Sequence, residues 1–542
     1  MLSYRKLAMR VLGHPLHTGG IDSPRPASQR AAAFILTAAM LTTLAAPAFA
    51  DIWHIENGDI TISAGESGNN VTQNNNTTYG DTNTIITNQN KDKASSHTVT
   101  IETNDKNDKV EVTLKDVNID TSSRNKAAVS VTGSGNTTIK LDGDNALKSD
   151  TYRSGIYGSG SGSLTITGGE NDSLTAQGGS SADGISSSGS LTISGGTVTA
   201  NGDDGGRGIS SSGSVTISGG STVTANGGSG TISGGDGIWS GGGVTISGGS
   251  TVTANGGNGG SLVGGDGIRS GGGLTVSDGT VTAKGGNGDS KDGYGGDGIR
   301  SGGVVTISGN TVNAAGGYGG KVGGYGICSF DRVAISGGTV EAAGGNGSTG
   351  GGSGIYSIVI DLSGSLELTA KAGSPTGKAL LQNGRELDLD TIKDKLGPGA
   401  KVTATDANGK TKQVSVPRPV EPEEPVIPEE SSSSSDGGSA APSAPASPLP
   451  GLTVTDKSGA VISYTSTQSG NTLTVCVGRL TASLHVSLAA LRQLRAEGIE
   501  TIAFQTVLCS TSLSVDELLA MGGEDAEAVL THRLTDSSLT VG

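Results

Sequence analysis

Along most of this chain, short segments that alternate apolar and small polar residues are separated by pairs of glycines. The dipeptide Gly-Ile opens each unit, and successive copies lie 24 to 31 residues apart. The copies start at Gly155, Gly184, Gly208, Gly237, Gly267, Gly298, Gly326 and Gly354. Such regular spacing is typical of a repeat architecture. None of these units shows the 3.6-residue apolar spacing of a helix, so the pattern predicts strands.

Each unit contains three extended segments, which read Gly-Ile-x-Ser, Val/Leu-Thr-Ile-Ser and Thr-Val-Thr-Ala. Short strands bury their apolar side chains when coils stack about 4.8 Å apart along an axis. The sequence therefore predicts an all-β, right-handed parallel β-helix with about 28–30 residues per coil. Three aliphatic ladders should fill its interior: Ile156, Ile185, Ile209, Ile238, Ile268, Ile299, Ile327 and Ile355; Ile166, Ile193, Ile217, Ile246, Val276, Ile307 and Ile335; and Leu174, Val198, Val223, Val252, Val281, Val312 and Val340.

Departures from the repeat divide the chain into parts. Residues 51–150 alternate less regularly and predict a cap with longer first coils, 151–372 are the regular coils, and 373–413 form a second cap. The longest insertions, 256–265 and 285–296, follow the third strand and should project from one edge. They are either ordered or merely floppy. Glycine, with 94 residues, is expected to supply positive φ angles at the corners.

The composition changes after the coils. Residues 414–450 hold nine of the fifteen prolines and a serine run, which is typical of a linker. Residues 451–542 predict a small α+β module with strands near 473–477, 499–507 and 538–541. Ser487 is expected to cap one helix, and Ser514 with Glu517 forms a capping box for a second.

The first fifty residues have the layout of a secretion signal. A basic lead precedes an apolar run at 31–46 and the cleavage pattern Ala48-Phe49-Ala50. Cleavage there removes five basic residues and one acidic residue, which moves the net charge from −15 to −19. An acidic secreted chain argues against nucleic acid as a partner. No second apolar span follows, so no transmembrane segment is expected after cleavage.

Three cysteines are present, and two of them lie in the last module. Cys476 and Cys509 are a candidate disulfide in an oxidising compartment. The alternative is that they are two isolated small apolar residues. Cys328 stands alone among the repeats.

Several blocks resemble a known family. Asp51-Ile52-Trp53, the block 110–120 (VEVTLKDVNID), the block 141–149 (LDGDNALKS) and the iterated GDGI, VTISGG and TVTA motifs resemble extracellular carbohydrate-binding β-helix proteins of clostridia. The resemblance covers roughly Asp51 to Ala372. It implies a fold of the pectate-lyase type, bound calcium, and polysaccharide binding at the bacterial cell surface. This chain carries fewer acidic residues per coil and more glycine than that family.

The residue after each repeated Ile should face outward and form a column. Aromatic rings suit the apolar faces of sugars, and arginine suits uronate carboxylates through paired hydrogen bonds. The predicted glycan-binding residues of this column are Tyr157, Trp239, Arg269, Arg300 and Tyr356. The alternative is an ordinary solvated face.

A second column lies two residues before each Ile and contains Asp236, Asp266 and Asp297. Carboxylates on consecutive coils repel one another, and Ca²⁺ would relieve the repulsion with further oxygens from the corner. These three aspartates are therefore the candidate calcium ligands, and the alternative is a solvated corner.

These surface columns lead to the following expectations about function. The leading prediction is a secreted or cell-surface polysaccharide-binding protein without catalytic activity. A structural adhesin or stalk is the first alternative, and a calcium-dependent polysaccharide lyase the second. Threonine rows in the third strands, such as Thr222 and Thr224, also allow ice binding. No Ser/His/Asp arrangement or metal-ligand spacing appears, and the oligomeric state stays open.

Overall fold

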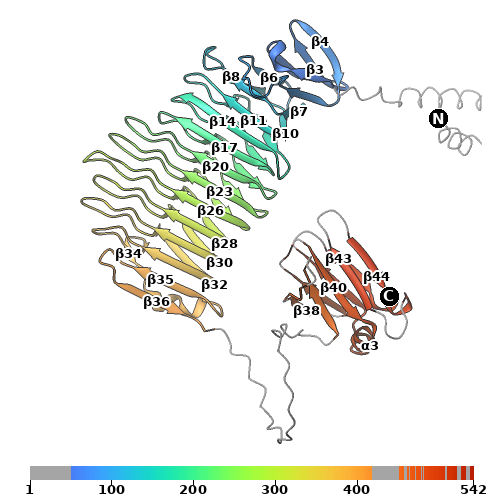
Figure 1. Cartoon of the computed structure of the whole chain (residues 1–542). Helices are drawn as coiled ribbons and strands as arrows, with labels where there is room; N and C mark the ends of the chain where they lie inside the picture. The colour runs from blue at the N-terminus through green and yellow to red at the C-terminus, as the bar shows by residue number, and fades with distance from the viewer. Residues whose placement is uncertain are drawn as a thin grey trace, which may run out of the picture. The chain divides into compact units, whose positions relative to one another are not determined.

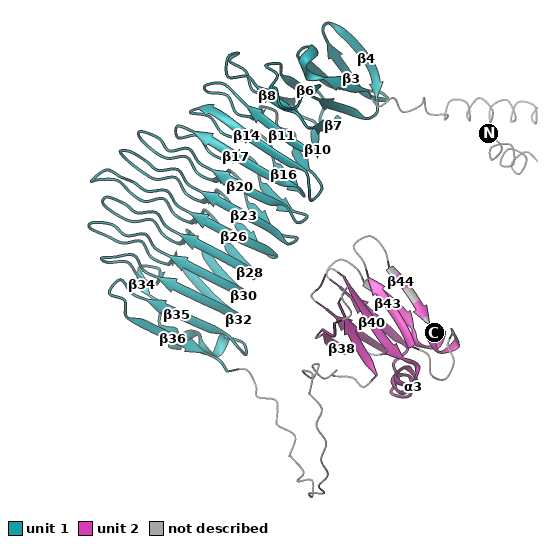
Figure 2. Cartoon of the chain, in the orientation of Figure 1, with its two compact units in different colours: residues 1–422 teal, residues 423–542 magenta. Residues whose placement is uncertain are grey.

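The computed structural model describes residues 51–417 and, with gaps, 451–541. The gaps are 457–459, 463, 470, 478, 480, 507–509, 522–526 and 533–536. The signal segment 1–50 and most of the linker, 418–450, lie outside the described residues. The chain divides into two compact units, 1–422 and 423–542, each of which is described by itself (Figure 2).

The first unit is the predicted parallel β-helix, whose strands stack one above the next along the axis (Figure 1). The first segments of the coils form one 15-stranded sheet, parallel except at its two ends. Its strands are β2 (Ile60–Gly65), β3 (Gly68–Gln73), β4 (Asn76–Asp81), β6 (Val99–Thr103), β9 (Val129–Gly133), β12 (Ile156–Gly158), β15 (Ile185–Ser187), β18 (Ile209–Ser211), β21 (Ile238–Ser240), β24 (Ile268–Ser270), β27 (Ile299–Ser301), β29 (Ile327–Ser329), β31 (Ile355–Ser357), β33 (Leu380–Gln382) and β34 (Arg385–Glu386).

The second and third segments of the coils belong together to one 21-stranded sheet. They are separate strands in the early coils and merge into single long strands in β28, β30 and β32. The strands are β1 (Ile52–His54), β5 (Thr84–Thr87), β7 (Lys109–Lys115), β8 (Asn118–Asp120), β10 (Asn136–Asp142), β11 (Asp144–Lys148), β13 (Leu164–Thr167), β14 (Ser173–Ser180), β16 (Leu191–Ser194), β17 (Thr197–Asp203), β19 (Val215–Ser218), β20 (Thr222–Asn226), β22 (Val244–Ile246), β23 (Ser250–Asn255), β25 (Leu274–Val276), β26 (Gly279–Lys284), β28 (Val305–Ala315), β30 (Arg332–Ala343), β32 (Val359–Lys371), β35 (Lys401–Thr405) and β36 (Thr411–Ser415).

The three predicted ladders are the core of the β-helix. Each side chain in them is at most 1% exposed. The parallel register stacks like on like, as in Ile238 with Ile268 and Ile268 with Ile299. A fourth column, which begins each second segment, is buried as well and includes Leu191, Val215 and Val244. The narrow aliphatic interior explains why only 3% of the chain is aromatic.

Both ends of the β-helix are covered. The antiparallel strands β3 and β4 extend the 15-stranded sheet at its start. At the far end, the 3₁₀ helix η2 (Leu389–Lys395) buries Leu389 and Ile392. Strand β36 pairs antiparallel with β35 and buries Val414 against the core. The second cap therefore extends past the predicted boundary at residue 413.

The insertions after the third strands are ordered and form a structure that we call the glycine wing: residues 227–235, 256–265, 285–296, 316–324 and 344–352. A zigzag of backbone hydrogen bonds crosses it, as in Gly257 N to Gly235 O and Gly265 N to Gly257 O, both 2.8 Å. The expectation that these insertions are floppy is wrong. The glycines serve close approach, because a Cβ on Gly265 would lie 1.9 Å from Gly235 O. Positive φ angles occur instead between the second and third strands, as at Gly219 and Gly248.

The second unit is an α+β module with two four-stranded sheets. Its elements are β37 (Leu452–Thr455), β38 (Thr465–Ser469), β39 (Thr472–Cys476), β40 (Ala482–Ser487), α3 (Leu488–Ala496), β41 (Thr501–Gln505), β42 (Ser510–Ser514), α4 (Val515–Met521), β43 (Glu527–His532) and β44 (Ser537–Val541). As predicted, the Ser487 side chain caps α3, by accepting from Ala490 N. No helix within the described ranges has the length and apolar character needed to cross a membrane.

Candidate functional site

The outward column on the 15-stranded sheet exists in the predicted register. Trp239 pairs with Arg269, and Arg269 pairs with Arg300, each one coil further along the axis. Parallel pairing requires that all three side chains leave the same face of the sheet. Arg269 is exposed, whereas Trp239 and Arg300 are half-buried.

Not every member of the column is accessible. Ser210 and Cys328 have the predicted register, next to Trp239 and Arg300, but they are buried, at 6% and 1% exposure. Tyr356 stacks on Tyr325 with 5.1 Å between ring centroids. Tyr157 is 42% exposed but lies three coils before Trp239. The structure therefore groups the two arginines and separates the two predicted tyrosines from them.

The column of aspartates is buried, so the expectation of a solvated corner is wrong. Asp236, Asp266 and Asp297 are only 3% to 6% exposed. One carboxylate oxygen of each accepts the backbone N–H of the next residue in the column, at 2.7 to 2.8 Å. These hydrogen bonds join consecutive coils, which gives the aspartates a structural role.

Burial shapes the ionisation of these aspartates. It raises the pKa of Asp297 to about 6, and it also raises the pKa of Asp236. The pKa of Asp266 is raised well above its ordinary value, first by burial and then by the charges of Asp297 and Asp236 on either side. The middle carboxyl is therefore the group most readily protonated.

Stability should depend on pH through this column. The folded chain retains a proton on Asp297 up to about pH 6, whereas the unfolded chain releases it near pH 3.8. The contribution of Asp297 to the free energy of unfolding should therefore fall by about 3 kcal/mol as the pH rises through that window. Asp297→Asn keeps the acceptor oxygen but cannot ionise. In urea unfolding, the free energy of unfolding of Asp297→Asn should rise relative to that of the wild type between pH 4 and pH 6.5. A difference in unfolding free energy that stays constant over this range would contradict the raised pKa of Asp297.

The two columns meet in one hollow, which we call the arginine cleft. Its volume is about 640 Å³. Its charged lining residues are Asp183, Arg207, Asp236, Asp266, Arg269 and Arg300, and Val263 of the glycine wing also lines it. Arg207 and Arg300 approach Asp236 and Asp297 at 3.5 and 3.3 Å.

Most of the accessible charge in the arginine cleft is positive, and Asp183 is the one lining carboxylate that is only half-buried. The side chains of Arg207 and Arg300 are 36% and 37% exposed, whereas those of Asp236 and Asp297 are 9% and 5% exposed. Among the described residues, Arg269 makes no ion pair shorter than 4.0 Å. An incoming ligand would therefore meet guanidinium groups, with the carboxylates beneath them.

Arg207 was not predicted as a site residue, because it interrupts the aspartate column in the sequence. Its guanidinium lies over the Trp239 ring, with 4.4 Å from Cζ to the ring centroid. One face of Trp239 is thus occupied by this cation–π contact. The sequence could have indicated this role, because an arginine side chain is long enough to reach the next coil.

The aspartates do not fit a calcium site. Calcium takes six to eight oxygen ligands, but here one oxygen of each aspartate already accepts a backbone N–H. Guanidinium groups approach the second oxygen of Asp236 and Asp297. Within the part of the chain that the structure describes, no three His, Cys, Asp or Glu side chains are grouped to hold a metal. The geometry favours charge neutralisation by arginine.

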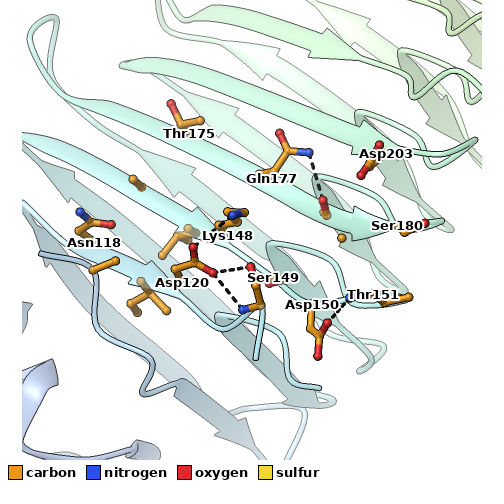
Figure 3. A pocket seen from close by; sticks show the side chains of 17 residues that line it. Asn118, Asp120, Lys148, Ser149, Asp150, Thr151, Thr175, Gln177, Ser180 and Asp203 are labelled. Carbon is orange, nitrogen blue, oxygen red and sulfur yellow. Dashed lines mark hydrogen bonds and ion pairs between the residues drawn. The ribbon is translucent and has the colours of Figure 1, made fainter. Parts of the chain in front are cut away.

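A second hollow, of about 770 Å³, lies on the early coils and was not predicted (Figure 3). We call it the N-terminal groove. Asn118, Thr175 and Gln177 line it with neutral polar groups. Its ionisable lining residues are Asp120, Lys148, Asp150 and Asp203, and Lys148 is already paired with Asp120 at 3.2 Å. This groove is larger than the arginine cleft, but its surplus of carboxylates would repel an acidic ligand.

Two further predictions stay untested. Cys476 donates its thiol to Gln505 Oε1 at 3.2 Å, and Cys509 lies outside the described residues, so the disulfide stays a prediction. The threonine rows exist in register, as in Thr222 with Thr251 and Thr224 with Thr253. The register alone does not identify a ligand for them.

Comparison with known proteins adds no family. No protein-family model matches the chain, and neither the curated proteins nor the solved structures contain a match. The β-helix and its arginine cleft are therefore the basis on which function is argued.

Proposed function

We propose that this chain is a non-catalytic protein of the cell exterior that binds an acidic polysaccharide in the arginine cleft. One observation supports the proposal above the others: partly exposed guanidinium groups of Arg207 and Arg300 are paired with nearly buried carboxylates. Arginine pairs with carboxylates through two parallel hydrogen bonds. Arg269, which has no ion pair of its own among the described residues, is the group we assign to the first carboxylate.

A polymer suits the cleft better than a small anion. Arg269 and Arg300 lie one coil apart, about 4.8 Å along the axis. An extended chain with a carboxylate on each unit could meet them in succession. The acidic net charge of −15 opposes long-range attraction of polyanions, so recognition would depend on these local contacts.

Binding without catalysis is the simpler proposal for this cleft. The guanidinium group remains protonated at physiological pH and is a poor general acid or base. The aspartates beneath are held by the backbone hydrogen bonds of the next coil. The sequence pattern of a secretion signal at 1–50 supports a location outside the cell.

Isothermal titration calorimetry with a galacturonate oligomer tests the proposal. Arg269→Ala should weaken binding at least tenfold, because a charge-assisted hydrogen bond contributes about 1.5–3 kcal/mol. Arg332→Ala is the matched control, since Arg332 is exposed and is not part of the cleft. Equal affinity of Arg269→Ala and the wild type would contradict the proposal. Absence of saturable binding by the wild type would favour a stalk without a glycan ligand.

A further inference from the structure

The glycine wing carries a row of exposed apolar side chains. Ile232, Leu262, Val263 and Tyr294 are 60%, 53%, 41% and 43% exposed. Val263 bridges to Tyr294, and Tyr294 bridges to Val322, in parallel pairs on successive coils. Parallel pairing directs these three side chains to the same face of the wing. Contiguous exposed apolar groups often mark a binding surface.

This row borders the arginine cleft. Val263 lines the cleft together with Arg269, which is six residues further along the same coil. Tyr294 stands in the same relation to Arg300 on the next coil, because Val263 pairs with Tyr294 and Arg269 pairs with Arg300. A basic row on the sheet and an apolar row on the wing therefore run along the same axis with a repeat of one coil, and Val263 is the member of the apolar row that lines the cleft itself.

We propose that the wing is the second wall of the binding site, and that Tyr294 stacks on the apolar face of a pyranose ring. The inference rests on the proposed function and narrows its ligand to a uronan, whose units combine a carboxylate edge with an apolar ring face. A polyanion without rings, such as polyphosphate, offers the arginines its charge but gives Tyr294 nothing to stack on.

Other contacts favour Tyr294 over the predicted Trp239 as the stacking group. One face of Trp239 is already covered by Arg207. Tyr294 is 43% exposed, and the cation over its ring among the described residues, Lys321, is more distant, with Nζ 5.8 Å from the centroid. Lys321 places a positive charge over one face of the ring, which leaves the other face for a sugar and is consistent with an acidic ligand.

The test compares two probes, a galacturonate oligomer and polyphosphate, on the full chain. Tyr294→Ala should weaken uronate binding about tenfold and leave polyphosphate binding unchanged. Tyr294→Phe, which keeps the ring, should bind uronate like the wild type. Tyr318→Ala is the matched control: Tyr318 is 48% exposed on the wing but does not belong to the Val263 row. Thermal unfolding of each variant checks that the fold is intact.

The outcomes separate the two proposals. If Arg269→Ala loses uronate binding while Tyr294→Ala keeps it, the stacking wall is wrong and the proposed function stands. If Tyr294→Ala weakens the binding of both probes equally, the Tyr294 ring does not stack on a pyranose, and the inference is wrong in this case too. If the wild type binds neither probe, the proposed function fails together with the inference.

Discussion

Replacing Ile246 by aspartate should unfold the central coils. Ile246 is fully buried in the second ladder, between Ile217 and Val276 of the neighbouring coils. Loss of the aliphatic side chain alone costs about 2–5 kcal/mol, and an unpaired carboxylate in that interior adds a large desolvation cost. We expect the free energy of unfolding to fall by at least about 5 kcal/mol, measured by chemical denaturation followed by circular dichroism.

The neighbouring residue provides the control. Thr245 points outward from the same strand and is exposed. Thr245→Asp should change stability by less than about 0.5 kcal/mol, as surface substitutions usually do. Equal effects of the two substitutions would show that β22 does not alternate between core and solvent as described.

Adding one methyl group to Gly265 should disrupt the glycine wing. The new Cβ would lie 1.9 Å from the carbonyl oxygen and 2.4 Å from the carbonyl carbon of Gly235, and both are backbone atoms. No side chain can rotate to relieve the overlap, so the stacked insertions of the glycine wing must move apart. We expect this to lower the free energy of unfolding by about 3 kcal/mol or more. Because Gly265 also lines the arginine cleft, uronate binding should be lost as well. Denaturation and titration calorimetry measure the two effects.

A second glycine of the wing distinguishes the effect of steric overlap from a general need for glycine. A Cβ on Gly350 would meet only side-chain atoms of Thr376 and Val322, at 3.6 Å, which is ordinary contact. Gly350→Ala should therefore leave stability and binding unchanged. A loss as large as that in Gly265→Ala would show that the wing requires glycine for a reason other than close approach.

The repeat in the sequence was sufficient to predict the coils, because one interior position per strand recurs at nearly constant spacing. Ile268 and its neighbours in the column were assigned to the core, and each is buried as predicted. The Gly-Ile spacing also predicted the outward register of Arg269 and Arg300. Because the backbone repeats, the residue spacing alone predicts which side chains of successive coils lie next to one another.

Contacts between different strands of a coil, or between a strand and the glycine wing, could not be predicted from the residue spacing. Asp266 was expected at a solvated or calcium-bound corner, but the wing folds beside it and buries it. Arg207 was passed over because its role depends on reaching Trp239 on the next coil. Tyr294 lies in an irregular insertion, where the sequence alone does not set a register. The errors on Asp266 and Tyr294 have the same cause, which is that the glycine wing is ordered and packs beside the sheet.

Hydrogen–deuterium exchange of the full chain, with and without a galacturonate oligomer, tests the site most directly. We expect the ligand to slow exchange in the two regions that contribute lining residues to the arginine cleft, residues 262–266 at the end of a wing insertion and the sheet strands β24 and β27. Slowing confined to the N-terminal groove, at 118–122 and 146–151, or to the module after residue 451 would contradict this expectation.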